Sequence, residues 1–370
     1  MIIKITFLSI SFLLLSCSVT TPKNEQNLDK KTIGLLPTEK QPELQEIVEF
    51  KGLQLTGVAV NDDGRMFASF PRWRKNIPFS VIEIFPNGTY VPYPDKEWNT
   101  WNGEPEKKQY ASVQSIIINQ NYLYVLDSSS PEMKGVLGKA KLYRFDLTKN
   151  KLNKKWEFDH RVAPFGSNLS DLVIDNSEQK VFISDSGLGG IIVLDLKTGE
   201  SKRFLDKHPS TKAEDVVLSV NKKIYDKKVH VNGLALSPID GKLYYHALTA
   251  YNLYRVPSMT MDTHLRDETK IVKEVERIGV TPAPDGMVFD KNGNLYMADL
   301  ERNAVSYRTN SGEMKILIQD ERINWPDELT IDNQNNLIFS DSQVQKTAVG
   351  GSVENIVFKI YKVALPKSDK

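Results

Sequence analysis

Short apolar segments separated by polar turns recur along most of this chain, and one pattern of positions appears six times. In each copy a polar residue precedes a short apolar run, a turn follows, and a second apolar run comes next. Runs of this length, bounded by turn residues, predict β-strands. The six copies begin at Thr56, Gln114, Ser170, Asn232, Asp285 and Asp327.

The spacing of the copies predicts the fold class. Successive copies start 42 to 62 residues apart, which is enough for four short antiparallel strands and their turns. That is the content of one propeller blade, so the sequence predicts an all-β, six-bladed β-propeller over residues 47–366. The last copy is short of a strand. We expect Glu46–Phe50 to complete the sixth blade and cover its open edge.

One turn residue in each copy follows the first strand, where an Asx or hydroxyl side chain can bond the backbone of its own turn. We therefore interpret these residues as structural. They are Asn61, Asn119, Asp175, Ser237, Asp290 and Asp332.

The residues that begin the copies are all polar, and the first strand of each propeller blade lines the central channel. They would therefore converge on the channel axis. One interpretation is that they bond only to water and backbone. Another is that Asn232, Asp285 and Asp327 hold a cation, because two carboxylates about 6 Å apart repel by roughly 3 kcal/mol at an effective dielectric of 20. With Ser170 as a fourth ligand, this oxygen-only set favours Ca²⁺ or Mg²⁺.

Two positions near the channel mouth are candidates for ligand contact. Asn168 and Trp325 lie two residues before the start of their copies, as His230 does in the fourth copy. His230 and Asp171 are the candidates for proton transfer. His246 falls at a register that other copies fill with apolar or small residues, so we expect it to be packed.

Two insertions could shape the mouth. The first blade carries a long insertion with Trp73, Trp98 and Trp101. These tryptophans either pack on neighbouring strands, or Trp98 and Trp101 form an aromatic wall against which a ligand stacks. A second, charged insertion at about residues 205–228 could shield the same face.

The N-terminus predicts export. Lys4 followed by the apolar run Ile5–Leu15 is typical of a secretory signal, and Leu14–Cys17 resembles the lipobox of bacterial lipoproteins. Residues 1–16 would be the signal and Cys17, the single cysteine, the lipidated residue. The polar residues up to 46 would tether the domain to an outer membrane or cell surface. The alternative is an ordinary signal with an incidental cysteine.

Charge and motifs limit the function classes. Without the signal the chain carries 47 basic and 47 acidic residues, so no nucleic-acid footprint is visible. The sequence contains no GxSxG, HExxH or GxxxxGK motif, which leaves serine, zinc-protease and nucleotide chemistry without support. We expect a monomer.

Several segments resemble the major royal jelly protein and yellow family over residues 47–365. The most specific are "PYPDKEWNTW", "VNGLALSPIDGKLYYHALTAYNLYRVPS" and "GGSVENIVFKIYKV". The resemblance implies a six-bladed propeller, and it links the chain to binders of small amines and to proteins of dopachrome chemistry.

A weaker likeness is to the senescence marker protein and gluconolactonase family of metal-dependent lactonases. That family's metal-binding Asn and Asp match Asn232 in "NGLALSP" and Asp285 in "PDGMVFD". Its N-terminal Glu ligand is missing near Thr56, and Ser170 stands where it has Asn.

Three functional hypotheses follow. The first is a membrane-tethered propeller that binds a small molecule at its central channel, over a divalent cation if one is bound. The second is an enzyme, either a metal-dependent hydrolase of lactones or esters or a dopachrome-tautomerase-like protein. The third is a platform for protein docking.

Overall fold

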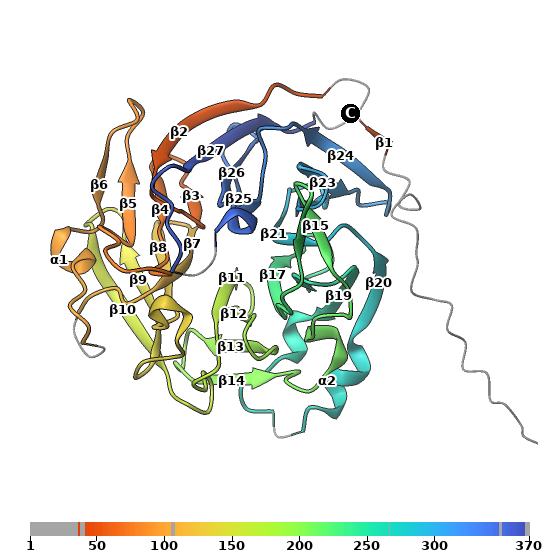
Figure 1. The fold of residues 1–370 in the computed structure, drawn as a ribbon. Coiled ribbons are helices and arrows are strands. Elements are labelled where there is room, and N and C mark those ends of the chain that lie inside the picture. The colour runs from red at the N-terminus through yellow and green to blue at the C-terminus, as the bar shows by residue number, and fades with distance from the viewer. Residues whose placement is uncertain (1–35, 38–40, 105–107, 266, 348–349, 367–370) are drawn as a thin grey trace, which may run out of the picture. The chain divides into compact units, whose positions relative to one another are not determined.

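The computed structural model describes residues 36–37, 41–104, 108–265, 267–347 and 350–366. Six sheets of antiparallel strands surround a common centre, which confirms the predicted six-bladed propeller (Figure 1). The predicted signal and most of the tether lie outside the described residues. No described helix is long and apolar enough to cross a membrane.

Each of the first four blades contains four consecutive strands, interrupted only by the hairpin β15–β16 between blades three and four. Blade one consists of β3 (Val58–Val60), β4 (Met66–Ser69), β5 (Val81–Ile84) and β6 (Tyr90–Pro92). Blade two consists of β7 (Val113–Asn119), β8 (Tyr122–Asp127), β9 (Ala140–Asp146) and β10 (Lys151–Phe158). Blade three consists of β11 (Leu169–Asp175), β12 (Lys180–Asp185), β13 (Ile191–Asp195) and β14 (Ser201–Phe204). Blade four consists of β17 (Val231–Leu236), β18 (Lys242–Ala247), β19 (Asn252–Pro257) and β20 (Glu276–Val280).

The last two blades each take a strand from the N-terminal part of the chain. Blade five consists of β21 (Pro284–Phe289), β22 (Leu295–Asp299), β23 (Ala304–Arg308) and β24 (Met314–Gln319), and β1 (Leu36–Pro37) pairs parallel with β24. Blade six consists of β25 (Pro326–Ile331), β26 (Asn336–Asp341), β27 (Val357–Ala364) and β2 (Gln45–Lys51).

Strand β2 closes the ring as the sequence predicts. It pairs antiparallel with β27, so the first long strand and the last strand of the described chain share one sheet. The strand begins two residues before the predicted domain boundary at residue 47. Phe50 at its end is 2 % exposed and packs edge-on against Phe70 of blade one.

One hydrophobic cluster of buried residues lies between each pair of neighbouring blades. Each sheet therefore buries both faces, which explains why the strands contain continuous apolar runs. The described residues also form helices α1 (Lys96–Asn99) and α2 (Thr269–Glu274) and four short 3₁₀ turns.

The turn residues mostly act as predicted. Asp175, Asp290 and Asp332 each accept backbone N–H bonds from residues two to four positions on, and Asn61 and Ser237 do the same. Asn119 differs, because its side chain pairs with Asn176 of the next blade.

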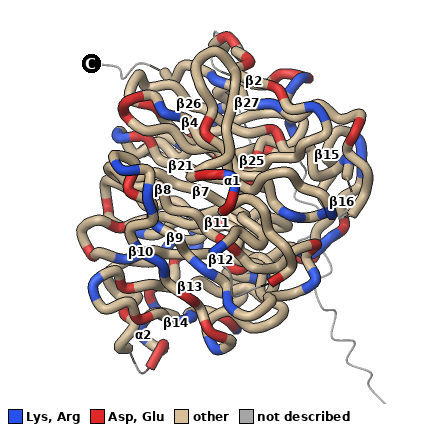
Figure 2. The backbone as a smooth tube through the Cα atoms, turned by 90° about the vertical axis from the view of Figure 1, so that its left-hand side faces the viewer, with Lys and Arg blue, Asp and Glu red and all other residues tan. Residues whose placement is uncertain are grey.

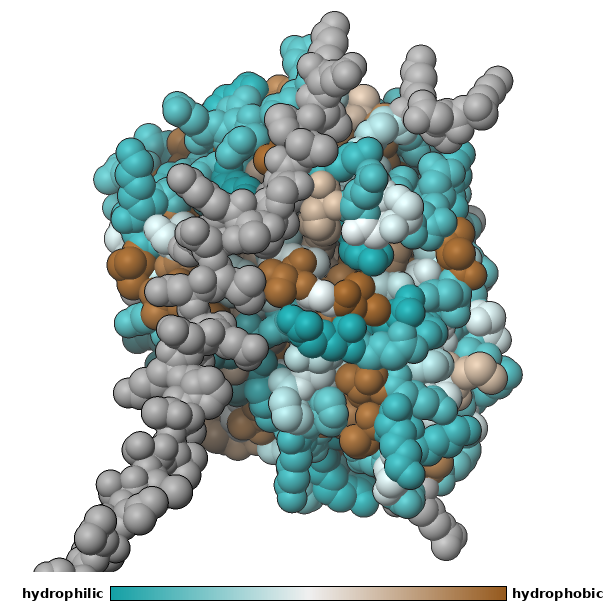
Figure 3. Space-filling view, turned by 90° about the vertical axis from the view of Figure 1, so that its right-hand side faces the viewer, coloured by the Kyte–Doolittle hydropathy of each residue, from teal (hydrophilic) through white to brown (hydrophobic). Residues whose placement is uncertain are grey.

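The charges and apolar groups that remain on the surface are dispersed. Lys and Arg alternate with Asp and Glu along the backbone in Figure 2. On the face drawn in Figure 3, hydrophobic residues form small groups separated by hydrophilic ones. Neither view shows a continuous band of one kind.

Candidate functional site: the central cavity

A cavity of about 300 Å³ lies at one end of the central channel. Its lining includes all six residues that begin the sequence copies: Thr56, Gln114, Ser170, Asn232, Asp285 and Asp327. Five of these residues lie in the inner strands β7, β11, β17, β21 and β25, and Thr56 lies two residues before β3. The six inner strands lie next to one another around the centre (Figure 1). The structure therefore brings the predicted register together at one place.

Local breaks in strand pairing point these side chains inward. The register between first and second strands shifts at Gln114, Asn232, Ser170–Asp171, Asp285–Gly286 and Asp327–Glu328. A β-bulge leaves a residue unpaired and turns its side chain out of the regular alternation. Where two residues are bulged, two consecutive side-chain positions face the channel. This is how Asp171 and Glu328 join the cavity lining.

Glycines allow the bulged strands to lie close together. A Cβ atom at Gly233 would overlap the carbonyl oxygen of Asp285, and one at Gly286 would overlap that of Asp327. A larger residue at either position would force the inner strands apart.

A recurring aspartate at the end of the second strand holds the residues at the mouth. The Asp185 carboxylate accepts a bond of 2.9 Å from the backbone N–H of Asn168, and that of Asp341 accepts one of 2.6 Å from Trp325. Asp127 does the same for Ser112 in blade two. This role was not predicted, although Asp closes the second run in four of the six copies.

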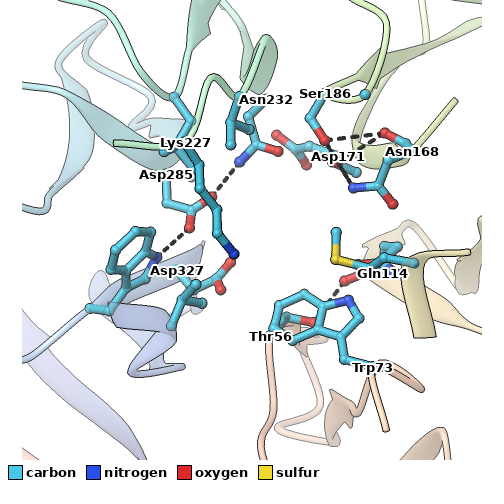
Figure 4. A pocket seen from close by; sticks show the side chains of 18 of the residues that line it. Thr56, Trp73, Gln114, Asn168, Asp171, Ser186, Lys227, Asn232, Asp285 and Asp327 are labelled. Atoms are coloured by element: carbon cyan, nitrogen blue, oxygen red, sulfur yellow. Dashed lines mark hydrogen bonds between the residues drawn. The ribbon is translucent and has the colours of Figure 1, made fainter. Parts of the chain in front are cut away.

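Asp285 is the centre of a bonded group in the floor. Its Oδ2 accepts a bond of 2.6 Å from the indole N–H of Trp325, and its Oδ1 accepts a short bond from the amide of Asn232 (Figure 4). The carboxylate is 6 % exposed, and burial raises its pKa to about 6 although both bonds act in the opposite direction. Three blades thus contribute to one network.

Asp171 is the second deeply buried carboxyl group. Its oxygens accept bonds from the backbone N–H groups of Leu172 and Leu234. Burial raises its pKa to about 7, and the charge of Asp285 adds to the effect. A proton on Asp171 is therefore exchangeable near neutral pH.

Asp327 and Glu328 complete an acidic floor. Burial raises the pKa of both well above the usual range, reinforced by Asp285 for Asp327 and by Asp171 for Glu328. Glu328 also accepts a bond of 2.8 Å from Ser115 in blade two. Among the described residues, no Lys or Arg side chain forms an ion pair with any of the four carboxyl groups. The floor therefore favours protons or a cation.

The walls above the floor are largely apolar. They include Trp73, Met133, Val229, Leu248, Trp325 and Val344. Trp325 is fully buried and packs edge-on against Tyr225, with 5.0 Å between ring centroids. Apolar walls over a few polar groups are the usual composition of a small-molecule site.

The second insertion covers part of the mouth. Its hairpin, β15 (Leu218–Val220) and β16 (Lys223–Tyr225), lies against blades five and six. Ser219 bonds Glu301, and Asn221 bonds the backbone of Asn324. Tyr225, Lys227 and Lys228 at the end of the insertion line the cavity.

The two histidines differ in position. His246 is fully buried, with Nδ1 2.6 Å from the Ala247 oxygen and Nε2 3.0 Å from Thr281, which confirms that it is packed. His230 is outside the lining, and its Nδ1 accepts a bond from the backbone N–H of Ala213. Burial, with a further effect of Lys212, lowers the pKa of His230.

The three tryptophans of the first insertion also differ in position. Trp98 is 4 % exposed and packs in the core against Tyr143 and Phe145, and Trp101 is contacted by Arg72. Neither lines the cavity, so the geometry favours packing over an aromatic wall for both. Trp73, from the same insertion, is the one of the three that lines the cavity.

The proposed metal ligands are only partly assembled. Asn232 and Asp285 are in contact, while Ser170 bonds the Asn168 carbonyl and lies beside Ser186. Within the described ranges, no three His, Cys, Asp or Glu side chains form a group that could hold a metal ion. A cation would need the amide oxygen of Asn232 turned toward Asp285, where the amide nitrogen now lies. Because no basic side chain of the described residues neutralises the floor, a cation that binds after this rotation of the Asn232 amide would supply the missing positive charge.

Fold and cavity together define a six-bladed propeller with a central pocket above acidic groups. The family model described as "Major royal jelly protein" matches residues 111–369, and the chain belongs to this family. Major royal jelly protein 3 of Apis mellifera is 26 % identical over 213 residues, 56 % of this chain and 39 % of the relative. Major royal jelly protein 6 is 26 % identical over 222 residues, 58 % of this chain and 50 % of the relative. The matches thus span half or less of these relatives' length.

Solved structures share the fold. A gluconolactonase from Xanthomonas campestris has a TM-score of 0.54 at 15 % identity, covering 90 % of this chain and 97 % of that one. A streptogramin B lyase has a TM-score of 0.52 at 13 % identity, covering 88 % and 98 %. At these identities the likeness shows the fold alone.

Proposed function

We propose that this protein is an exported propeller, tethered to a membrane through a lipid on Cys17, which binds a small molecule in its central cavity. The observation that carries the proposal is the convergence of six register residues and apolar walls on one cavity of about 300 Å³. Such a cavity is of the size and composition that suit small ligands. The amine binders to which the sequence resemblance links this chain would suit an acidic floor.

A divalent cation is the second part of the proposal. Asn232, Asp285 and Asp327 would hold it, and oxygen donors of this kind suit Ca²⁺ or Mg²⁺. When bound, the ion would neutralise the floor and polarise an oxygen of the ligand. The ion would also lower the pKa of Asp285, because a nearby positive charge favours the carboxylate.

Thermal unfolding of the purified full chain tests both parts, with Ca²⁺, Mg²⁺ and a panel of amines, sugars and lactones. A ligand at a hundred times its dissociation constant stabilises the folded state by about 2.7 kcal/mol, which raises the melting temperature by several degrees. Asp285→Asn should abolish the shift, and Asp62→Asn on an exposed turn should keep it. If no compound or ion shifts the wild type, the proposed function is wrong.

A second candidate is acid–base catalysis on a lactone, an ester or a tautomerising ring. The observation in its favour is that Asp171 lines the cavity with a pKa of about 7, suitable for a group that takes and returns a proton. We expect Asp171→Asn to abolish any hydrolysis found in a substrate screen while the variant keeps the circular dichroism spectrum of the folded wild type. Full turnover in that variant would exclude Asp171 from the reaction.

A further inference from the structure

Two adjacent lysines at the cavity mouth have different surroundings. The Lys228 ammonium donates to the Glu214 carbonyl at 2.7 Å, to Asp215 at 3.0 Å and to the Val216 carbonyl at 3.3 Å. Lys227 also lines the cavity, but its ammonium forms no ion pair with any residue in the described ranges. Figure 4 shows its side chain extending inward from the loop, on the side of the cavity where Asp327 lies.

The cavity lining therefore combines acidic groups with a basic one. Asp171, Asp285, Asp327 and Glu328 form the floor, and none of them is paired with a basic side chain of the described residues. Lys227 provides a positive charge at the mouth. The walls are largely apolar and aromatic, with Trp73 and Tyr225 among them.

This combination restricts what can fill the cavity. A ligand with only a cationic group would neutralise the acidic groups of the floor and leave the Lys227 ammonium facing apolar atoms of the ligand. A simple anion would contact Lys227 but place no positive charge on the floor. A molecule with an ammonium group, an apolar body and a carboxylate satisfies both the floor and Lys227, because each charge meets its opposite in a partly water-excluded site.

We propose that Lys227 is a specificity-determining residue and that the ligand is a zwitterion of the aromatic amino-acid type, with its ammonium at the floor and its carboxylate at Lys227. The inference rests on the proposed function, since it names the class of molecule bound in the same cavity, with the ammonium group in place of the divalent cation. It goes further in requiring an anionic group that an amine lacks.

Calorimetry with three matched probes tests the inference on the full chain in detergent. Phenylalanine carries both charges, 2-phenylethylamine only the ammonium, and 3-phenylpropionate only the carboxylate. We expect the wild type to bind phenylalanine up to about fivefold more tightly than either other probe, since a partly exposed ion pair contributes up to about 1 kcal/mol.

Variants at the two lysines identify the source of the preference. Lys227→Gln should weaken the binding of phenylalanine about fivefold and leave the affinity for 2-phenylethylamine unchanged. Lys227→Arg should retain the preference for phenylalanine. Lys228→Gln is the matched control and should leave the order of the three probes intact.

The outcomes separate the inference from the proposed function. If 2-phenylethylamine binds the wild type as tightly as phenylalanine, or if the two Gln variants act alike, the inference is wrong. It is also wrong if none of the three probes binds while another small molecule does. If no small molecule of any class binds, both the inference and the proposed function are wrong.

Discussion

The indole Nε1 of Trp325 donates a hydrogen bond of 2.6 Å to Oδ2 of Asp285, and this bond joins the sixth blade to the fifth. The same tryptophan is held by Asp341 through its backbone N–H, and Asp285 in turn accepts a bond from Asn232 of the fourth blade. A structural aspartate at the end of β26 is thus connected to the cavity floor through one buried side chain.

Replacing Trp325 with Phe should lower the free energy of unfolding more at high pH than at low pH. A hydrogen bond to a charged group contributes about 1.5–3 kcal/mol, and Asp285 is charged only above its pKa of about 6. We expect the loss in unfolding free energy to be about 1–2 kcal/mol larger at pH 8 than at pH 4.5, measured by urea denaturation.

Trp156→Phe is the matched control for that experiment. Trp156 is 5 % exposed, and its indole nitrogen has no hydrogen-bond partner among the described residues. Its substitution should lower the free energy of unfolding by similar amounts at both pH values. A pH-independent loss for Trp325→Phe as well would mean that the bond does not stabilise a charged Asp285.

Asp285→Asn should raise the stability of the protein at pH 8. The pKa of Asp285 is raised from 3.8 to about 6, so between these values the folded state binds the proton more tightly than the unfolded state. Stability is therefore lost as the pH rises through this range, and the full cost of about 3 kcal/mol is present at pH 8. The variant should gain up to that amount at pH 8 and nothing at pH 3.5. Destabilisation at pH 8 would show that the charge is compensated.

Much of the fold could be predicted because the propeller repeats one local pattern. The polar residue before each apolar run gave both the blade count and the register, and the short sixth copy identified the closing strand at residues 46–50. These features depend on neighbours in sequence, where periodicity is informative.

The composition of the site depends on contacts that sequence spacing does not encode. The doubled bulge that brings Glu328 into the lining follows from how the inner strands pair, and Glu328 reaches Ser115 of a blade 213 residues away in sequence. Trp73, Trp98 and Trp101 lie in one insertion, yet only tertiary packing decides that Trp73 lines the cavity. For the same reason the lack of an ion pair for Lys227 within the described residues was not predicted.

Cys17→Ser should release the protein from the membrane. Cys17 is the single cysteine of the chain, so a thioether-linked lipid has no other attachment point. Two or more acyl chains anchor a protein firmly, because each buried methylene contributes about 0.8 kcal/mol. We expect the wild type to incorporate labelled palmitate and to partition into a detergent phase, and the variant to do neither. Equal partitioning of both would remove the anchor from the proposed function.

Closure of the ring should depend on residues 45–51 and not on the tether before them. A variant that begins at Gln41 keeps β2 and should melt within about 2 °C of the full chain, whereas one that begins at Gly52 exposes the edge of β27 and empties the site of Phe50. In the full chain, Phe50→Ala should cost about 3–5 kcal/mol, the usual value for a buried phenylalanine. Differential scanning calorimetry of the three variants distinguishes the effect of losing the closing strand β2 from the effect of shortening the N-terminus. If the variant beginning at Gly52 melts as a single transition at the wild-type temperature, β2 is dispensable and the sixth blade is stable with three strands.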